Sequence, residues 1–187
     1  MSVGWNCRCG KVRLVVATGE GARCVCYCRD CRAFHTHLGA DAWLDPAGGM
    51  DLWQTIPDRI ELVRGAEHLA ALRLTDRGPL RFHTTCCGSP VANLPPKRDM
   101  PFAALATRGL EDPDAVGPVG ATISAKSATG PVRARGNVPL YVAGVMLRVA
   151  RARIAGRHRA TPFFDEAGQP VVPVRRLSGE ERAAAYG

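Results

Sequence analysis

Three short cysteine clusters constrain the fold of this chain more than any other feature of its sequence. They are Cys7-Arg8-Cys9, the stretch CVCYCRDC at residues 24–31, and Cys86-Cys87. Zinc prefers thiolate and imidazole ligands in tetrahedral geometry, and a C-x-C or C-x-x-C turn brings two sulfur atoms within reach of one ion. Two such turns from distant parts of the chain would hold a small β-domain together.

Eight cysteines would also suit four disulfides in a secreted protein. However, the first residues, MSVGWNCRCGKVRL, contain no uninterrupted apolar segment of the kind found in a secretory signal. The longest apolar run, residues 138–147, is too short to cross a bilayer. The sequence therefore predicts a cytoplasmic protein, in which thiols stay reduced, and it favours metal binding over disulfides.

Up to about residue 108 the chain has the pattern of short strands separated by turns rich in Gly, Pro and Asp. Strands are predicted within residues 9–18, 59–65, 68–75, 79–84 and 100–108. No long helical pattern lies between them. This pattern predicts a mainly β fold built from curled antiparallel sheets.

The chain divides into three parts on composition. Residues 1–109 are predicted to form a zinc-binding β-domain, residues 110–137 a linker or loop rich in small residues and proline, and residues 138–187 a C-terminal helical extension. A terminal helix is expected from Ser178, which forms a capping-box signature with Glu181.

The extension begins with a basic amphipathic helix, and Pro139 suits its first turn. Its apolar stripe is expected to pack on the β-domain, with the arginines in solvent. The stripe consists of Leu140, Ala143, Leu147, Ala150 and Ile154.

The formal net charge of +8 comes almost entirely from arginine, and residues 133–159 contain no acidic side chain. Such charge favours solubility and weak attraction to anionic partners. Contact of the basic helix with a membrane surface or a nucleic acid is an open alternative, although no recognised nucleic-acid-binding motif accompanies it.

The number of sulfur atoms in each cluster predicts two different metal sites. Cys26, Cys28 and Cys31 supply three ligands from one loop, which is one short of a tetrahedron. Cys7 and Cys9 can complete a second tetrahedron with the Cys86-Cys87 pair. We therefore expect one or two zinc ions per chain, one in a closed structural site and one in an open site.

The combined pattern resembles the glutathione-dependent formaldehyde-activating enzymes, a family that shares its domain with centromere protein V. The resemblance rests on C-x-C-G at residues 7–10, C-x-C-x-x-C-R at residues 26–32, and R-F…C-G-S-P at residues 81–90, in the order of the family. It covers roughly residues 3–108. It implies a zinc-stabilised fold of the β-tent type, a structural zinc on the outer cysteines and a second zinc on the central three. It also implies carbon–sulfur chemistry on the adduct of glutathione and formaldehyde.

This chain departs from the family pattern at the structural site. The family has C-x-x-C-G, whereas residues 84–88 read Thr-Thr-Cys-Cys-Gly, with threonine where a ligand is expected. Either Cys86, from the adjacent position, or His83 could replace it. This difference indicates a diverged bacterial-type branch.

Other residues near the central cluster allow more than one interpretation. Cys24 has no counterpart in the family and is expected to be a buried strand residue. His35 is a possible fourth ligand of the central zinc or an ordinary loop residue. Arg29 and Arg32 could lower the thiol pKa values and attract an anionic substrate such as glutathione, or they could be solvated. Asp30 could orient a bound group or cap a turn.

Two functions from different classes follow. The first is a zinc-dependent carbon–sulfur lyase-like enzyme that acts on the aldehyde adduct of a small glutathione-type thiol, since zinc lowers the pKa of a thiol that it binds. The alternative is a non-catalytic zinc module in which both metals are structural and the basic C-terminal helix binds a partner. A zinc-thiolate redox sensor is a third possibility. The sequence does not indicate an oligomeric state.

Overall fold

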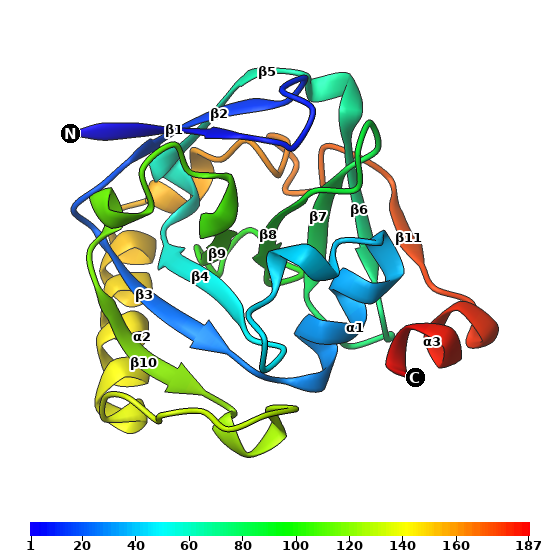
Figure 1. Ribbon diagram of the computed structural model, residues 1–187. Helices are drawn as coiled ribbons and strands as arrows, with labels where there is room; N and C mark the ends of the chain where they lie inside the picture. The colour runs from blue at the N-terminus through cyan, green and yellow to red at the C-terminus, as the bar shows by residue number, and fades with distance from the viewer.

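The computed structural model describes residues 1–187 and contains two β-sheets and three α-helices (Figure 1). The smaller sheet is antiparallel, with strand order β1-β2-β5. Its strands are β1 (Ser2–Asn6), β2 (Arg13–Ala17) and β5 (Ile60–Arg64).

The larger sheet has eight strands in the order β10-β3-β4-β9-β8-β7-β6-β11. Its central pairings are antiparallel, whereas the outermost strands β10 and β11 pair in parallel with β3 and β6. The strands are β3 (Gly21–Cys26), β4 (Met50–Thr55), β6 (Leu69–Arg73), β7 (Leu80–Thr84), β8 (Pro90–Leu94), β9 (Ala103–Ala106), β10 (Val119–Ile123) and β11 (Val174–Arg176).

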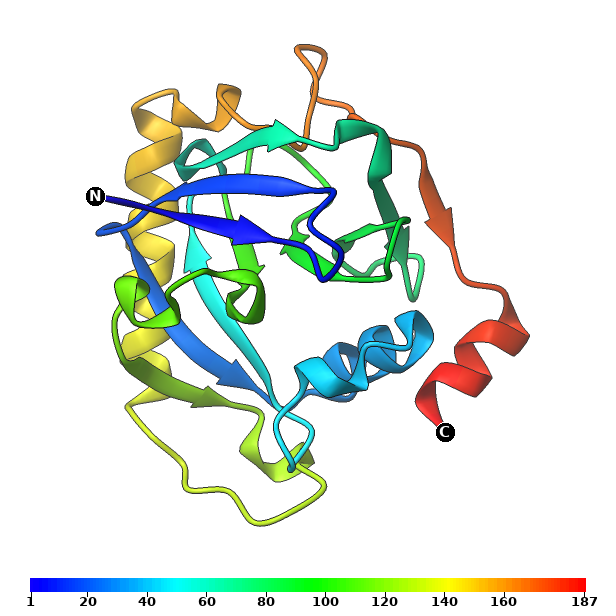
Figure 2. The same cartoon turned by 45° about the horizontal axis from the view of Figure 1, so that its top comes forward.

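The main hydrophobic core lies between the two sheets, because the smaller sheet lies across the larger one (Figure 2). In β2, burial alternates along the strand, with Leu14 and Val16 facing the core. Phe82, Val91 and Leu105 meet them from the larger sheet. The mainly β fold predicted from the sequence is therefore confirmed.

Five of the predicted strands are present as β2, β5, β6, β7 and β9, each within its predicted range. The sequence did not predict β1, β3, β4 and β8. The prediction of residues 110–137 as linker or loop was wrong for β10, which joins the edge of the larger sheet beside β3. Its small residues favour a loop locally, but Ala121 is buried by this pairing.

The helix α1 (Arg29–Leu38) directly follows the central cysteines, where the sequence predicted a loop. It begins at Cys28 as its N-cap residue and ends at Gly39, which has a φ of 62°. Phe34 on its buried face packs on Leu72 of β6. The prediction of a loop was therefore wrong from Arg29 onward. The closely spaced cysteines suggested a metal-binding loop, and the helical spacing of buried residues in α1 was not recognised.

The last helix, α3 (Gly179–Tyr186), packs on α1. Both hydrogen bonds of the predicted capping box between Ser178 and Glu181 are present. The Tyr186 hydroxyl donates a hydrogen bond to Asp30 at 2.7 Å, so the end of the chain contacts the central cysteine motif.

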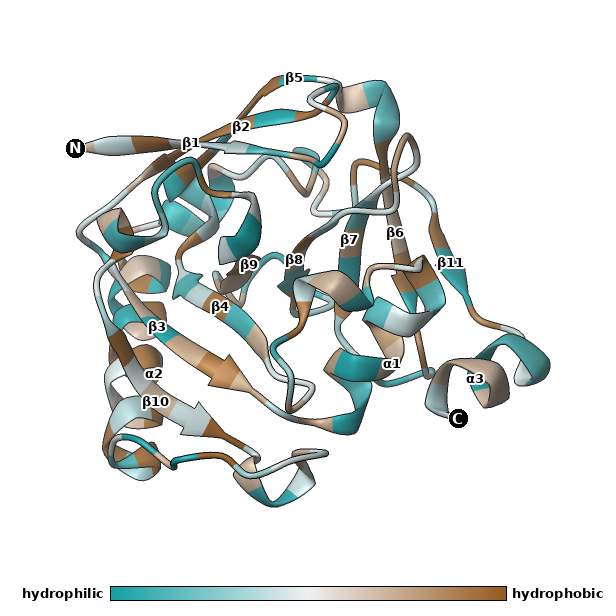
Figure 3. Cartoon of the chain, in the orientation of Figure 1, coloured by the Kyte–Doolittle hydropathy of each residue, from teal (hydrophilic) through white to brown (hydrophobic).

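The predicted basic helix is present as α2 (Val138–Ile154), with Asn137 as its N-cap residue, and it runs alongside β3 and β10 (Figure 1). The prediction of its packing face was wrong. Leu140 is 71% exposed and Ile154 is 88% exposed, whereas Val145 and Val149 are buried. Apolar residues lie on both the buried and the exposed face of α2, and brown as well as teal segments of the helix are visible in Figure 3, so spacing alone does not select the docked face.

Polar contacts explain which face of α2 docks. The Tyr141 hydroxyl and the Arg148 guanidinium donate to backbone carbonyls at the start of β3, at 3.0 and 3.4 Å. Beyond the helix, Arg157 forms ion pairs with Glu20 and Asp58. None of the helices combines the length and the apolar composition that crossing a bilayer requires.

Candidate metal centre and adjoining cleft

The outer cysteines come from two turns that lie far apart in the sequence. Cys7 follows β1 directly, and its turn closes when the Gly10 N–H donates to the Cys7 carbonyl at 2.9 Å. Cys86 and Cys87 lie in the turn between β7 and β8. The packing of the smaller sheet on the larger one therefore brings Cys7 and Cys9 next to the second turn.

Gly88 is required in the second turn. Its φ is +66°, in the left-handed region that favours glycine. A Cβ atom at this position would also lie 2.7 Å from the carbonyl oxygen of Leu38 at the end of α1. The turn that carries Cys86 and Cys87 thus contacts the helix that begins at the central cluster.

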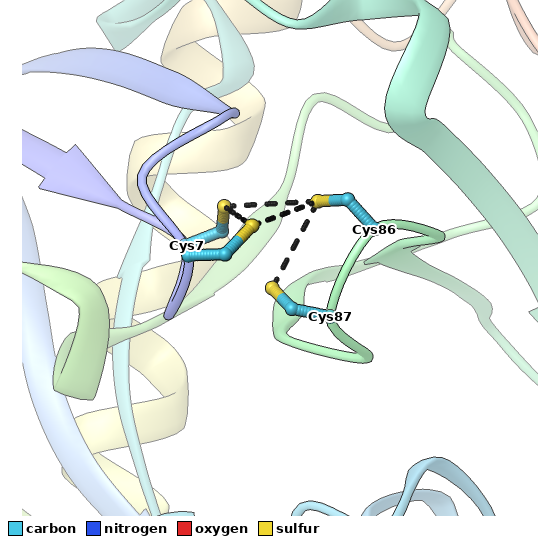
Figure 4. A group of neighbouring side chains, drawn as sticks. Cys7, Cys86 and Cys87 are labelled. Atoms are coloured by element: carbon cyan, nitrogen blue, oxygen red, sulfur yellow. Dashed lines mark hydrogen bonds between the residues drawn. The ribbon is translucent and has the colours of Figure 1, made fainter.

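The four outer sulfur atoms have the spacing that one tetrahedral zinc ion requires, and three of them are labelled in Figure 4. The Sγ–Sγ distances are 3.6 Å for Cys7–Cys9, 3.9 Å for Cys7–Cys86, 3.4 Å for Cys9–Cys86 and 3.8 Å for Cys86–Cys87. Zinc–sulfur bonds of about 2.3 Å give tetrahedral edges of about 3.8 Å. The donor set and its spacing therefore fit a structural zinc ion.

Hydrogen bonds within the second turn favour the thiolate form of Cys87. Burial raises its pKa, but the hydroxyls of Ser89 and Thr84, at 3.2 and 3.4 Å from its sulfur, outweigh burial and lower the pKa to about 5. Burial and the contact with Cys9 instead raise the pKa of Cys86 to about 12. Metal binding requires the thiolate, so the hydroxyls prepare Cys87 for this role.

Cys86 belongs to this cluster and His83 does not. Successive residues of a strand point to opposite faces, so Thr84 faces the cluster while His83 faces away from it. The His83 ring lies edge-on to Phe34, with 6.2 Å between the ring centroids. The Thr84 hydroxyl lies 3.4 Å from the Cys87 sulfur.

The central cluster forms where β3 passes into α1. Cys26 is the last residue of β3, Cys28 is the N-cap residue of α1, and Cys31 lies in the first helical turn. The Cys31 N–H donates to the Cys28 sulfur at 3.4 Å, and the three sulfur atoms lie within 4.8 Å of one another. The positive end of the helix dipole favours thiolates at this position.

The three central thiols differ in pKa. Hydrogen bonds from Cys26 and Cys31, assisted by the charge of Arg81, lower the pKa of Cys28 to about 2. The same contact with Cys28 raises the pKa of Cys26 to about 12. The negative charge of the cluster is therefore concentrated on Cys28.

This three-sulfur cluster borders a cleft of about 490 Å³, because Cys28 and Cys31 form part of its lining. Besides the two cysteines, the cleft is lined by six apolar residues and three polar ones. The apolar residues are Pro79, Leu94, Pro95, Pro96, Met100 and Phe102, and the polar residues are Asp30, Arg81 and Asn93. The arrangement places a three-ligand metal site next to a space of ligand size.

Arg81 is one of two polar residues of this cleft, the other being Asn93, that sequence reasoning did not select as site residues. It is only 3% exposed, and its guanidinium lies over the face of Phe34 at 5.3 Å. It donates to the Asn93 side chain at 3.2 Å and lies 3.9 Å from the Asp30 carboxylate. Its position in the R-F motif of the resembled family was the available signal.

Arg29 and Arg32, which the sequence allowed as substrate-binding or solvated residues, do not line this cleft. The Arg29 guanidinium lies over the ring of Tyr186 at 5.9 Å, and Arg32 donates to the carbonyl of Ser127 at 2.9 Å. Helix α1 turns these side chains away, because only Asp30 and Cys31 of its first turn face the cleft.

His35 lies outside the group of three sulfur atoms. It is fully buried, and its Nδ1 atom lies 2.8 Å from the carbonyl of Cys31. Burial lowers its pKa to about 4. Cys24 is fully buried in β3, as predicted.

Three comparisons place the chain among known proteins. A model described as "Family of unknown function (DUF6151)" matches residues 1–175. A crystal structure of a Rhodobacter sphaeroides protein is 19% identical, and the alignment covers 65% of this chain and 99% of that one with a TM-score of 0.43. None of the curated proteins matches the sequence.

Proposed function

This chain belongs to the DUF6151 family, and we propose that it is a zinc protein with one structural site and one thiol-binding site. The outer cysteines would hold the structural zinc. The central cysteines would hold a second zinc next to the cleft. A small thiol and its aldehyde adduct would bind at this second site and react there. This function is related to that of the glutathione-dependent formaldehyde-activating enzymes.

One observation carries the proposal: the central cluster offers three sulfur ligands and borders a cleft. Structural zinc sites have four protein ligands, whereas catalytic sites have three and leave a position for substrate or water. No histidine or carboxylate completes the group of Cys26, Cys28 and Cys31. The fourth position would therefore be available to a ligand that enters from the cleft.

The proposed reaction joins a thiol to an aldehyde and reverses the addition. When bound, zinc would supply Lewis acidity, which favours the thiolate form of a thiol. In the addition, the S–H bond breaks, a carbon–sulfur bond forms, and the proton ends on the former carbonyl oxygen. In the reverse reaction the carbon–sulfur bond breaks and the proton returns to sulfur.

The chain's own residues would orient the adduct. The Asp30 carboxylate lines the cleft beside Cys31, and the Tyr186 hydroxyl holds it in place from 2.7 Å. It could accept a hydrogen bond from the adduct's hydroxyl group. Phe102 and the neighbouring prolines would exclude water from the reacting atoms.

The alternative function, partner binding through the basic helix, receives less support from the contacts of α2. Arg148 donates to a backbone carbonyl of β3, and Arg153 pairs with Asp99 at 3.2 Å. Arg157 is held by two carboxylates. These arginines stabilise the fold, which leaves fewer free charges for a partner.

The first test is elemental analysis of zinc in the purified, zinc-reconstituted protein and in a variant with Cys26, Cys28 and Cys31 replaced by serine. We expect two zinc ions per chain to fall to one, with the circular dichroism spectrum unchanged. Cys24→Ser is the matched control and should keep two ions. One zinc ion in the wild-type protein, unchanged in the triple variant, would contradict the proposal.

The second test measures the rate of hemithioacetal formation from a thiol and formaldehyde. The wild-type protein should accelerate the reaction, and the triple serine variant should not. A wild-type protein with two zinc ions that neither binds thiols nor changes this rate would leave the second zinc structural.

A further inference from the structure

We propose that the cleft selects a thiol with an apolar, uncharged body over a multiply charged peptide thiol such as glutathione. This inference rests on the proposed function, because it names the class of substrate that the same site would accept. It is carried by the apolar wall of the cleft, by the burial of the one basic side chain that lines it, and by the charge that the metal site would have with zinc bound.

The wall of the cleft is apolar because none of the charged residues of its own loop, Lys97, Arg98 and Asp99, lines it. Residues 94–102 read LPPKRDMPF and form most of this wall. Within the loop, Arg98 donates to the carbonyls of Asp165 and Glu166 at 2.6 and 3.0 Å, and Asp99 pairs with Arg153. The proline, methionine and phenylalanine side chains therefore form the surface that a ligand would meet.

The cleft presents little accessible positive charge to the carboxylates of glutathione. Arg81 is the only basic residue that lines it, and its guanidinium is 3% exposed, lies over the ring of Phe34 and donates to Asn93 at 3.2 Å. Its Nε atom has no hydrogen-bond partner but is buried, so a carboxylate in the cleft could reach it only if the surrounding side chains moved.

The charge of the metal site opposes an anionic ligand as well. Three thiolates and a divalent zinc ion carry a net charge of −1, and the Arg81–Asp30 pair adds none. The thiolate sulfur of a bound ligand would add one more negative charge at this site. Further carboxylates on the same ligand would be repelled, and the apolar wall offers them no solvation.

The size of the cleft suits an apolar body of moderate size. Its volume of about 490 Å³ lies within the range of small-molecule sites. An aromatic or branched aliphatic group could contact Met100 and Phe102 while the sulfur atom lies beside Cys28 and Cys31. We expect phenylmethanethiol to bind at least tenfold more tightly than glutathione.

The experiment measures both dissociation constants by calorimetry on the zinc-loaded full chain. Met100 lines the cleft and is 39% exposed, so Met100→Lys adds a cation without emptying the core. It should reduce the preference for phenylmethanethiol about tenfold, through weaker binding of this thiol and tighter binding of glutathione. Met146→Lys is the matched control, because Met146 lies on α2 outside the cleft and is 45% exposed.

The outcomes separate this inference from the proposed function. Equal binding of both thiols to the wild-type protein, with binding lost in the triple serine variant, would overturn the selectivity and leave the thiol site in place. Equal binding of phenylmethanethiol and sulfur-free toluene, unchanged in the triple variant, would overturn the thiol site and support the apolar cleft. An equal change in the ratio of the two dissociation constants in Met100→Lys and Met146→Lys would overturn the assignment of the selectivity to this wall.

Discussion

Replacing Cys86 with serine tests whether this residue completes the structural zinc site. Its sulfur atom lies within 3.9 Å of each of the other three, at 3.4 Å from Cys9, 3.8 Å from Cys87 and 3.9 Å from Cys7. Its loss would leave three sulfur ligands from two turns. Serine keeps the size of the side chain but replaces thiolate with a poor zinc ligand.

The magnitude follows from the four-sulfur geometry. Structural zinc sites contribute about 10 to 16 kcal/mol of binding free energy, or about 2.5 to 4 kcal/mol for each of four ligands. Loss of one ligand should weaken zinc binding by about two orders of magnitude. At a fixed excess of zinc, this change lowers the free energy of unfolding by about 3 kcal/mol. For a chain of this length the melting temperature should fall by about 6 to 12 °C.

The assay combines competition for zinc by a chelator with thermal melting at fixed zinc. His83→Ala is the control, because His83 is the other ligand that the sequence allowed and it packs against Phe34 instead. It should leave zinc affinity unchanged. Wild-type zinc affinity in Cys86→Ser, together with weaker binding in His83→Ala, would refute the ligand assignment.

Four further variants test the packing of the chain. Val149→Ala should lower the free energy of unfolding by about 2 kcal/mol, whereas Ile154→Ala should change it by less than about 0.5 kcal/mol, because only Val149 is buried. Chemical denaturation measures both values. A larger loss in Ile154→Ala than in Val149→Ala would support the docked face that was predicted from spacing. Arg157→Gln should cost about 1 to 2 kcal/mol near pH 7. Hydrogen bonds from Arg157 lower the pKa of Glu20 in the folded protein from 4.5. The stabilisation by this pair is therefore present above about pH 4.5 and is lost as the pH falls through the pKa of Glu20 in the folded protein. Urea unfolding should show a smaller difference between Arg157→Gln and the wild-type protein near pH 3. Gly88→Ala should destabilise the protein by about 2 kcal/mol or more, because Gly88 has a positive φ and a Cβ atom there would meet the backbone carbonyl of Leu38. Thermal melting measures this loss. An unchanged melting temperature would contradict the turn geometry.

Local spacing was sufficient to predict the cysteine groups and several strands. A C-x-C turn or a strand-to-helix junction holds its sulfur atoms close together wherever it lies, so Cys26, Cys28 and Cys31 could be grouped from the sequence. Alternation of apolar residues likewise predicted strands such as β2, because one face of each must be buried.

Spacing was insufficient where several arrangements satisfy the same pattern. Helix α2 has apolar residues on more than one face, and its docked face depends on partners such as the carbonyls of β3. The segment of β10 has the composition of a loop, and only pairing with β3 makes it a strand. Both choices depend on residues distant in sequence.

The motifs of the chain determined which residues can bind a metal ion and that the fold would be mainly β. Only the tertiary structure decided that Cys86 and not His83 joins Cys7 and Cys9, and that Arg81 and not Arg29 or Arg32 faces the cleft. The physical reason is that bonds between neighbouring residues set the spacing inside a motif. Strand pairing and core packing between distant residues determine which motifs meet. These long-range contacts cannot be predicted from the local sequence pattern.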